Sequence, residues 1–335
     1  MDIRFALPED NDRLLKIERE SAQEGNIWVV AYRENFFDRL KYFKDGFIMI
    51  AEEDGDIIGC IGVAFDDYYF NSRIMRGIYL FGLRTNPRYR MKIARWLKEV
   101  IGELERMLGP SDYGFAYAAV KADNIASIKI LKHMGFEYLS TLNFYACPVL
   151  RKLGNRSIEI DNRPRLENVF QFYESLKGDL DLAPENMNLF RPMIEENRIK
   201  IFKSYGAQAL VLDTSGEHDF GITRLSPGLR AFQIVGRGLL SPFVRIPKMN
   251  SKLRTWDVLM LEYEDLKEAR KVVSSIHKEA YKDGVTLLNF AQDESLGSLK
   301  PVVGKLSFKI PFELMITEKE RQDREKRPVL WLPTL

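Results

Sequence analysis

The sequence LFGLRTNPRYRMKIARWL, at residues 80–97, leads an apolar strand through a basic cluster directly into a helix. Backbone N–H groups in the first turn of a helix lack intrahelical partners and lie at the positive end of its dipole, so a phosphate placed there is stabilised. Four cationic side chains add to this charge, those of Arg88, Arg90, Lys92 and Arg95. Cations are disfavoured at a helix start unless an anion is bound there. The stretch therefore predicts an anion site, and the plainer alternative is a solvated helix face.

A second segment, DNIASIKILKHMGF at residues 123–136, is typical of a short amphipathic helix. Asn124 is a favoured N-cap residue, and Gly135 is favoured just beyond a helix end. Ser127 follows one turn after Asn124 on the same face. Asn124 serves either as an ordinary N-cap or as a ligand contact, and the two roles are compatible.

Together the two segments resemble the GCN5-related N-acetyltransferase (GNAT) family, over roughly residues 1–150. Pro87-Arg-Tyr-Arg90 matches the family's cofactor loop, and Asn124 and Gly135-Phe136 match the start and end of its later helix. The resemblance implies an α/β (α+β) fold, with a mixed, mostly antiparallel central sheet flanked by helices. It also implies acetyl-CoA (coenzyme A) as the cofactor.

The resemblance assigns the pantetheine arm of the cofactor to the end of the central strand, and its diphosphate to the turn that follows. The implied cofactor contacts are Leu83, Arg84, Thr85, Arg88, Arg90, Met91, Lys92, Ile93, Ala94, Arg95, Asn124 and Ser127. For the three strand residues the alternative is simply the end of a buried strand. The chain departs from the family in lacking one loop glycine within Arg90-Met-Lys-Ile-Ala94, and in carrying Leu131 where the family often has a proton-donating Tyr.

Acyl transfer to an amine needs a base for the amine proton and polarisation of the thioester carbonyl, and it is helped by an acid for the thiolate. Backbone N–H groups near Phe81 can polarise the carbonyl, but the strand over residues 73–83 contains no carboxylate. The remaining candidates are Asp66 and Asp67, expected in a loop before that strand, together with Tyr79 and Tyr145. A solvated turn explains the acid pair equally, and sheet packing explains the tyrosines.

Composition sets the broad class of the protein. The length of 335 residues suits two domains of typical size. The formal net charge of +2 gives no reason to expect nucleic acid as a partner. The start Met1-Asp-Ile-Arg-Phe5 resembles no signal peptide and no apolar run is long enough to span a bilayer, so we expect a cytoplasmic protein without a membrane partner. Cys60 and Cys147 are expected as reduced core residues.

The three histidines, His133, His218 and His277, show no metal-ligand spacing, so we expect no metal site. The oligomeric state cannot be inferred from the sequence.

The first half alternates strands and helices. We expect a strand at residues 3–6, helices from Pro8 and over residues 32–43, and a hairpin of residues 47–51 with 57–65 across Asp54-Gly55. A central strand at 73–84, a helix at 94–108, a strand at 113–120 and a closing strand at 138–149 follow.

The second half repeats this order. We expect helices at 166–176 and 192–202, a hairpin of 209–212 with 220–225, a strand at 257–263, a helix at 266–281, a strand at 285–291, a helix from about Ser295 and a strand at 312–317. We therefore predict a GNAT-like domain at residues 1–150, a linker at 151–165 and a degenerate second copy at 166–335. The alternative is that any two α/β domains alternate in this way.

The second copy is not expected to bind a nucleotide. Its counterpart of the phosphate turn, Glu262-Tyr-Glu-Asp-Leu-Lys-Glu268, contains four carboxylates that would repel a diphosphate.

Three functions remain open from the sequence. The first is an N-acetyltransferase that transfers acetyl from acetyl-CoA, by direct attack, to an amine of a small molecule or peptide. The second is a catalytically silent acyl-CoA-binding or scaffold protein. The third is a two-domain transferase that uses another activated acyl donor, such as aminoacyl-tRNA, against which the absence of a basic stripe counts.

Overall fold

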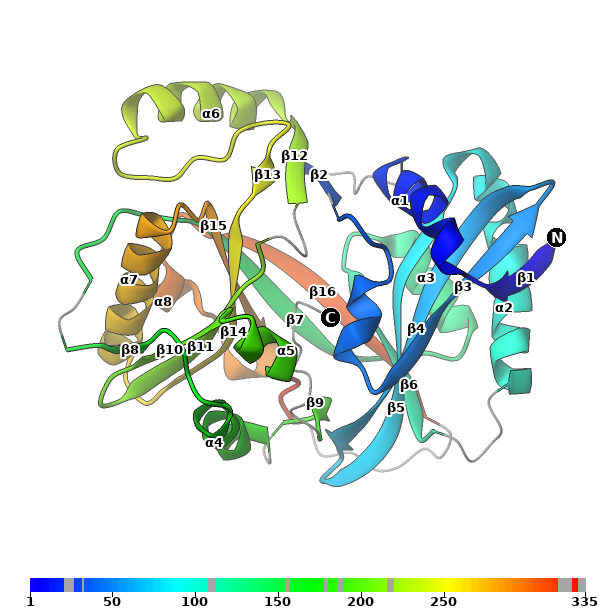
Figure 1. The fold of residues 1–335 in the computed structure, drawn as a ribbon, viewed down its shortest axis with the longest axis horizontal. Helices are drawn as coiled ribbons and strands as arrows, with labels where there is room; N and C mark the ends of the chain where they lie inside the picture. The colour runs from blue at the N-terminus through cyan, green and yellow to red at the C-terminus, as the bar shows by residue number, and fades with distance from the viewer. Residues whose placement is uncertain are drawn as a thin grey trace.

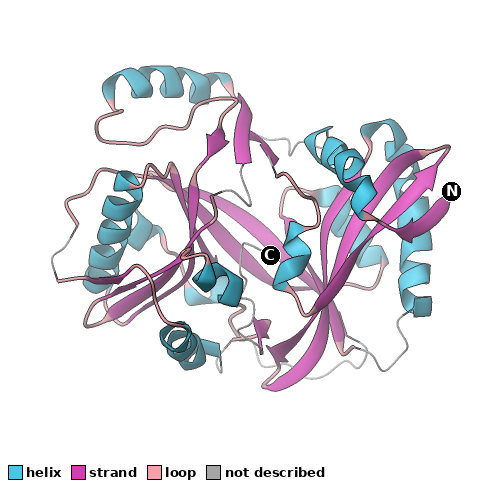
Figure 2. Ribbon diagram, viewed as in Figure 1, coloured by secondary structure: helices cyan, strands magenta, loops and turns pink. Residues whose placement is uncertain are grey.

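The computed structural model describes residues 1–20, 27–31, 33–107, 113–154, 157–177, 180–185, 190–215, 220–318 and 327–330. These residues form one large sheet flanked by helices and one small three-stranded sheet (Figure 2). The large sheet is mixed and mostly antiparallel, and its strands follow the order β1-β3-β4-β5-β6-β16-β7-β15-β14-β11-β10-β8, with β9 paired to β4. The predicted fold class is confirmed.

The first half contributes β1 (Asp2–Phe5), β3 (Asp45–Glu53), β4 (Asp56–Phe70), β5 (Arg73–Thr85) and β6 (Phe115–Lys121). The predicted hairpin of β3 and β4 is present. Asp54 and Gly55 form its turn with φ angles of 51° and 81°, which Gly and Asp adopt more readily than most residues. β4 then returns antiparallel to β5.

Two parallel crossovers mark the repeat between the halves. In the first, β5 leads through the short 3-10 helix η3 (Pro87–Lys92) and α2 (Ile93–Met107) into β6. In the second, β14 (Thr255–Tyr263) leads through α7 (Leu266–Lys282) into β15 (Leu287–Asp293). The antiparallel strands beside these pairs also correspond. In the second half they are β8 (Glu159–Asp161), β10 (Ile199–Lys203) and β11 (Ala207–Asp213), which take the places that β1, β3 and β4 have in the first half.

The closing strands of the two halves are exchanged. β7 (Glu137–Pro148), which follows α3 (Ile125–His133), pairs with β15 of the second half. β16 (Phe308–Glu318), near the end of the chain, pairs with β6 of the first half. β7 and β16 pair with each other and cross the middle of the molecule (Figure 1). The domain boundaries stay a prediction, but the strands of the two predicted domains interleave.

Helices cover both faces of β5. Tyr79 and Phe81 pack in one core cluster with α1 (Asn11–Glu20), whereas Ile78 and Leu80 pack in another with α2 and α3. Successive side chains of a strand point to opposite faces, so α1 and α2 lie on opposite sides of the sheet.

Several other elements complete the second half. β9 (Ala183–Pro184) pairs with the end of β4, and α4 (Leu166–Lys177) borders β8 and β10. η5 (Glu294–Leu296) and α8 (Lys300–Val303) lead into β16. The small sheet joins β2 (Ile27–Ala31), β12 (Phe220–Leu225) and β13 (Lys252–Leu253), and α6 (Pro227–Leu239) follows β12.

Four sequence predictions about elements were wrong. The helix expected at 32–43 is only the 3-10 helix η2 (Asp38–Tyr42), after the unpredicted strand β2, and the short 3-10 helix η1 (Pro8–Asp10) precedes α1. The helix expected at 192–202 ends early as α5 (Phe190–Glu195), because Ile199–Lys203 is instead a strand. The expected hairpin of 209–212 with 220–225 is absent because β12 pairs with β2 and β13. The helix expected from Ser295 is divided between η5 and α8.

Candidate active site

The parallel pairing of β5 and β6 stops partway along both strands. It runs from Gly77 opposite Phe115 to Leu80 opposite Ala118. Beyond that point β5 stays paired with β4 as far as Thr85, and β6 stays paired with β16 as far as Lys121. The two strands therefore diverge, and an opening forms between their carboxyl ends, where open α/β sheets often bind ligands.

A bulge in β5 lies at this point of divergence. Gly62 pairs with Phe81 and Cys60 pairs with Arg84, so β5 carries one residue more than β4 between these pairs. Gly82, within the bulge, has φ +62°, and no atom lies within 4 Å of the position where a Cβ would be. The extra residue shifts the side-chain alternation, so Phe81 and Arg84, three positions apart, both lie on the α1 face.

The opening between the strands is a cavity of about 590 Å³. Its walls come from the end of β5, the end of β6, and α3, and α2 contributes Leu97. Of the predicted cofactor contacts, Leu83, Arg84, Thr85, Asn124 and Ser127 all line it. The structure therefore brings together the strand and α3 parts of the predicted site.

The start of α3 borders the cavity. Asn124 is the N-cap, and its Oδ1 accepts a hydrogen bond from the backbone N–H of Ser127 at 3.2 Å. Asp123 also lines the cavity, but its carboxylate pairs with Lys121 at 2.8 Å. Leu131 lies further along α3, buried in the wall. A Tyr at this position would face the cavity.

The basic turn is described only in part. The backbone of residues 87–95 forms the unpredicted 3-10 helix η3 and the first residues of α2, which begins at Ile93, close to the predicted start at residue 94. The side chains of Arg90, Met91, Lys92, Ile93 and Ala94 lie outside the described part of the chain. Arg88 is exposed, and Arg95 is exposed and pairs with Glu99 at 3.1 Å. Neither Arg88 nor Arg95 lines the cavity.

None of the three predicted catalytic side chains lines the cavity. Tyr79 is buried and stacks on Tyr117, with ring centroids 4.8 Å apart. Tyr145 is buried in the core of the second half, where its hydroxyl lies 3.2 Å from Ser298 Oγ. Asp67 pairs with Lys44 at 2.7 Å. Catalytic roles for Tyr79, Tyr145 and Asp67 stay predictions, and this geometry does not favour them.

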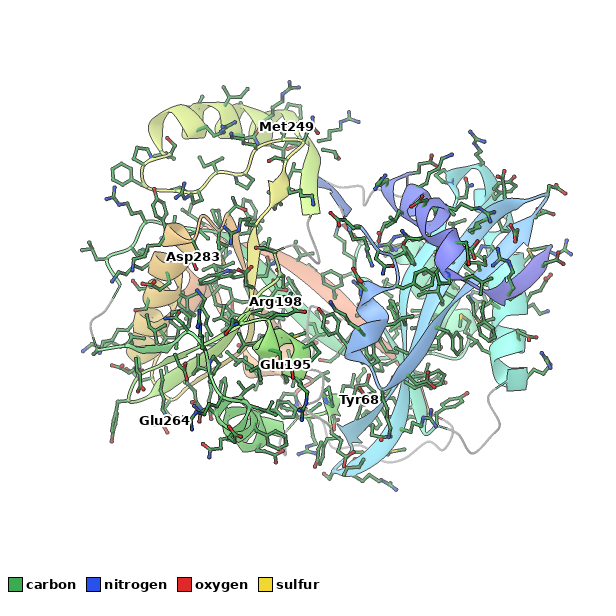
Figure 3. The ribbon with its side chains drawn as sticks, in the orientation of Figure 1. Tyr68, Glu195, Arg198, Met249, Glu264 and Asp283 are labelled. Atoms are coloured by element: carbon green, nitrogen blue, oxygen red, sulfur yellow. The ribbon has the colours of Figure 1, made fainter. Side chains whose placement is uncertain are left out.

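Asp66 and Asp67 lie within β4, not in a loop as expected from the sequence. Asp66 is buried, and burial raises the pKa of its carboxyl to about 6. Its Oδ1 accepts a hydrogen bond from the backbone N–H of Asp67 at 2.9 Å. Tyr68, labelled in Figure 3, follows and accepts a hydrogen bond from the Tyr117 hydroxyl at 3.2 Å.

A buried charge cluster beside the cavity was missed by sequence reasoning. Glu18 Oε1 pairs with Arg33 at 2.6 Å and with Arg84 at 3.5 Å. The Arg39 guanidinium lies 5.2 Å from the centre of the Phe81 ring. One signal was available in the sequence, because Glu18 follows Leu14 by four residues and so places a charge on the apolar stripe of α1.

The geometry agrees with the comparisons to known proteins. Residues 12–136 match the model of the acetyltransferase (GNAT) family. This part of the chain is therefore similar to the GNAT acetyltransferases. No curated protein sequence matches the chain.

Three solved structures show the same fold over nearly the whole chain. N-myristoyltransferase from Saccharomyces cerevisiae with bound myristoyl-CoA has a TM-score of 0.63 at 9% identity, covering 99% of this chain and 85% of the other. A GCN5-related N-acetyltransferase from Sphaerobacter thermophilus has a TM-score of 0.55 at 14% identity, with coverage of 97% and 98%. A putative acetyltransferase from Pyrococcus horikoshii has a TM-score of 0.55 at 11% identity, with coverage of 99% and 94%.

The corresponding turn of the second half is acidic and already capped. Asp265 is the N-cap of α7, and its side chain accepts a hydrogen bond from the backbone N–H of Glu268. Glu264, labelled in Figure 3, donates its backbone N–H to Gly206 O at 3.0 Å. Asn124 caps α3 in the same way, so the difference between the two turns is their charge, and the acidic side chains of the second turn agree with the prediction that no diphosphate binds there.

Within the described ranges, no group of three His, Cys, Asp or Glu side chains is placed to hold a metal ion. Over the same residues, no helix is both long and apolar enough to cross a membrane. Cys60 and Cys147 are buried free thiols, and burial raises the pKa of each to about 12.

Proposed function

We propose that the chain is an N-acetyltransferase that binds acetyl-CoA between β5 and β6 and transfers the acetyl group to an amine of a small molecule or peptide. The observation that carries the proposal is the end of the β5–β6 pairing at Leu80 and Ala118, with the cavity directly beyond it. The pantetheine arm would lie along residues 83–85, and the phosphates would lie near η3 and the start of α3. At the start of η3 the backbone N–H groups of Arg88 and Tyr89 already donate to Asn86, so the backbone donors for a phosphate would come from the start of α3.

The residues present fit this cofactor. The cavity of about 590 Å³ has the size of a typical ligand pocket, and its walls combine apolar side chains with polar groups at the ends of β5 and β6 and at the start of α3. In the reaction the amine nitrogen attacks the thioester carbonyl carbon. A C–N bond forms, the C–S bond breaks, the amine loses a proton and the departing thiolate gains one. Backbone N–H groups near the bulge would stabilise the carbonyl oxygen as its charge develops.

Leu131 supports a second candidate function, that of a catalytically silent acyl-CoA-binding protein. The described cavity wall contains no Tyr, His or Cys side chain that could protonate the thiolate. A GNAT-like domain without such a group fits a silent acyl-CoA-binding protein as well as a slow enzyme. The two functions differ in turnover and not in binding.

Release of CoA from acetyl-CoA across a panel of amines tests the proposal. Ser127→Asp is the informative variant, because Ser127 lines the cavity in the first turn of α3. An acid there suits the helix dipole but repels a phosphate, so activity should fall while the fold is kept. Ala126→Asp is the matched control, since Ala126 is exposed, lies one residue earlier and does not line the cavity.

We expect wild type and Ala126→Asp to release CoA at the same rate, and Ser127→Asp to release little. A thermal shift with CoA, measured for all three proteins, reports binding separately. If the wild type binds CoA but no amine promotes its release, the silent acyl-CoA-binding protein replaces the enzyme. If the wild type shows no shift with millimolar CoA, the site assignment itself is wrong.

A further inference from the structure

The charge cluster on the α1 face of β5 holds more positive than negative charge. Among the residues that the structure describes, three guanidinium groups, those of Arg33, Arg39 and Arg84, have one carboxylate among them, that of Glu18. Glu18 pairs with Arg33 and Arg84, and both Glu18 and Arg33 are buried. Within the described residues Arg39 makes no ion pair, and its closest recorded partner is the Phe81 ring.

Several polar atoms of this cluster lack partners. Arg39 Nε, Arg84 Nε and Glu18 Oε2 are buried and make no hydrogen bond to any described residue. Burial, and to a lesser extent the neighbouring charge of Arg33, lowers the pKa of Arg39 to about 10. At neutral pH Arg39 still carries its charge. The Arg39 side chain as a whole is half-buried, but its Nε is buried without an acceptor, and an unmade buried hydrogen bond is costly for a fold.

The cluster touches the proposed acyl-transfer site from the side opposite α2 and α3. Phe81 and Arg84 line the cavity, and the bulge at Gly82 turns both toward α1. Arg39 lies over Phe81, and Phe43 stacks on the same ring at 6.1 Å. The residues assigned to CoA phosphates lie at η3 and α3, and the side chains of α2 and α3 pack on the other face of β5. Arg39 itself does not line the cavity; it reaches the site only through Phe81, on the face opposite the helix starts assigned to the CoA phosphates.

We propose that the amine acceptor carries a carboxylate group, and that the Arg39 guanidinium binds this carboxylate beside Phe81. A guanidinium presents a planar pair of donors that matches a carboxylate, and it stacks on aromatic faces as Arg39 does here. Arg39 is only half-buried, so a ligand can reach it. The substrate class is thus an amino acid or a compound that likewise bears an amine and a carboxylate. The proposal rests on the acyl-transfer function proposed above.

The test compares amines that differ only in the carboxylate. Glycine, L-alanine, L-phenylalanine and L-lysine are assayed with acetyl-CoA beside their primary amides, and 2-aminoethylphosphonate tests whether a phosphonate can replace the carboxylate. We expect a lower KM for at least one amino acid than for its amide, by about tenfold or more, as a charge-assisted bidentate hydrogen bond would give. Arg39→Gln should abolish this preference. Lys41→Gln, an exposed cation on the same 3-10 helix, is the control and should retain it.

The outcomes separate this proposal from the acyl-transfer function. Acetylation of amides and amino acids with equal KM, or a preference that survives Arg39→Gln, would overturn the carboxylate site while leaving the enzyme intact. If no amine is acetylated, calorimetric titration of the same amino acids into CoA-saturated protein tests whether the carboxylate site exists. Binding that is lost in Arg39→Gln supports the site, and absence of binding overturns it.

The melting temperature of the ligand-free protein gives an independent measurement. If Arg39 is kept for a ligand, Arg39→Met should leave the melting temperature unchanged or raise it, because an unpaired charge has been removed. A clear decrease would show that Arg39 serves the fold instead, and would count against the proposal.

Discussion

In the proposed reaction, Leu131 is the residue that limits proton transfer to the departing thiolate. Leu131 lines the cavity on α3 and cannot donate a proton. General acid catalysis contributes roughly a hundred- to ten-thousand-fold. We therefore expect Leu131→Tyr to raise the rate of CoA release, measured at saturating acetyl-CoA. Leu131→Phe is the control for added ring volume and should not raise the rate. Equal rates for the two variants would mean that the new hydroxyl is out of reach.

Asp66 gives a prediction about pH. Its carboxyl has a pKa of about 6 in the fold and 3.8 as its ordinary value, so the folded state binds the extra proton between these pH values. The contribution of this carboxyl to the free energy of unfolding is greatest near pH 4 and below, and it is lost as the pH rises through 6. Asp66→Asn should stabilise the protein at pH 7.5 by roughly 1–3 kcal/mol and have little effect at pH 4.

Urea unfolding at the two pH values measures the effect of Asp66→Asn. An Asn side chain can still accept the hydrogen bond from the Asp67 N–H, so the substitution changes mainly the charge. If Asp66→Asn raised the free energy of unfolding equally at both pH values, Asp66 would not be protonated in the folded protein.

Some site residues could be predicted one by one, and others could not. Asn124 and Ser127 were found because a helix N-cap has a local signature. Leu83, Arg84 and Thr85, at the end of the central strand, were assigned to the cofactor by the family resemblance, and they line the cavity. Arg33 and Arg39 were missed because their partners, Glu18 and Phe81, come from other elements, and no local pattern reports such contacts.

At the scale of the element, the bulge in β5 shapes the site. Gly82 has φ +62° and free space around it, so a side chain there meets conformational strain and no clash. Gly82→Ala should cost roughly 1–2 kcal/mol, and Gly82→Asn less, because Asn tolerates this backbone region. Gly82→Val should cost most and weaken CoA binding. Urea unfolding and CoA titration of the three variants measure both effects.

Gly102→Ala supplies the contrast to the Gly82 series. Gly102 lies inside α2, has free space and has no positive φ, so Ala should stabilise the protein there. A Gly82→Ala variant as stable as wild type would contradict the positive φ at the bulge.

Elements with strong local patterns were predicted well. The β3–β4 hairpin follows from Asp54-Gly55, and α7 follows from its capped, periodic sequence. The small sheet was missed because β2, β12 and β13 are joined by long-range pairing. The segment at 199–203 has apolar residues at alternating positions, but it was read as the end of a helix.

At the scale of the whole molecule, the exchange of β7 and β16 ties the two halves together. The sequence indicated a repeat, but it could not show the exchange, because the pairing of a strand with a distant neighbour leaves no local signal. Since β16 lies between β6 and β7, neither half has a complete sheet without the other. We expect one cooperative unfolding transition.

Calorimetry and circular dichroism test this cooperativity. Trp96 lies in the core of the first half and Trp256 in that of the second, so fluorescence of single-Trp variants reports each half. All probes should give the same midpoint. Two separate midpoints would mean that the exchanged strands do not couple the halves.

The central claim is that the chain has one acyl-CoA site, between β5 and β6, and none at the acidic turn of the second half. Calorimetric titration of CoA into the wild type and Ser127→Asp tests it most directly. We predict one site per chain in the wild type and none in Ser127→Asp. Two sites per chain, no binding by the wild type, or unchanged binding in Ser127→Asp would contradict it.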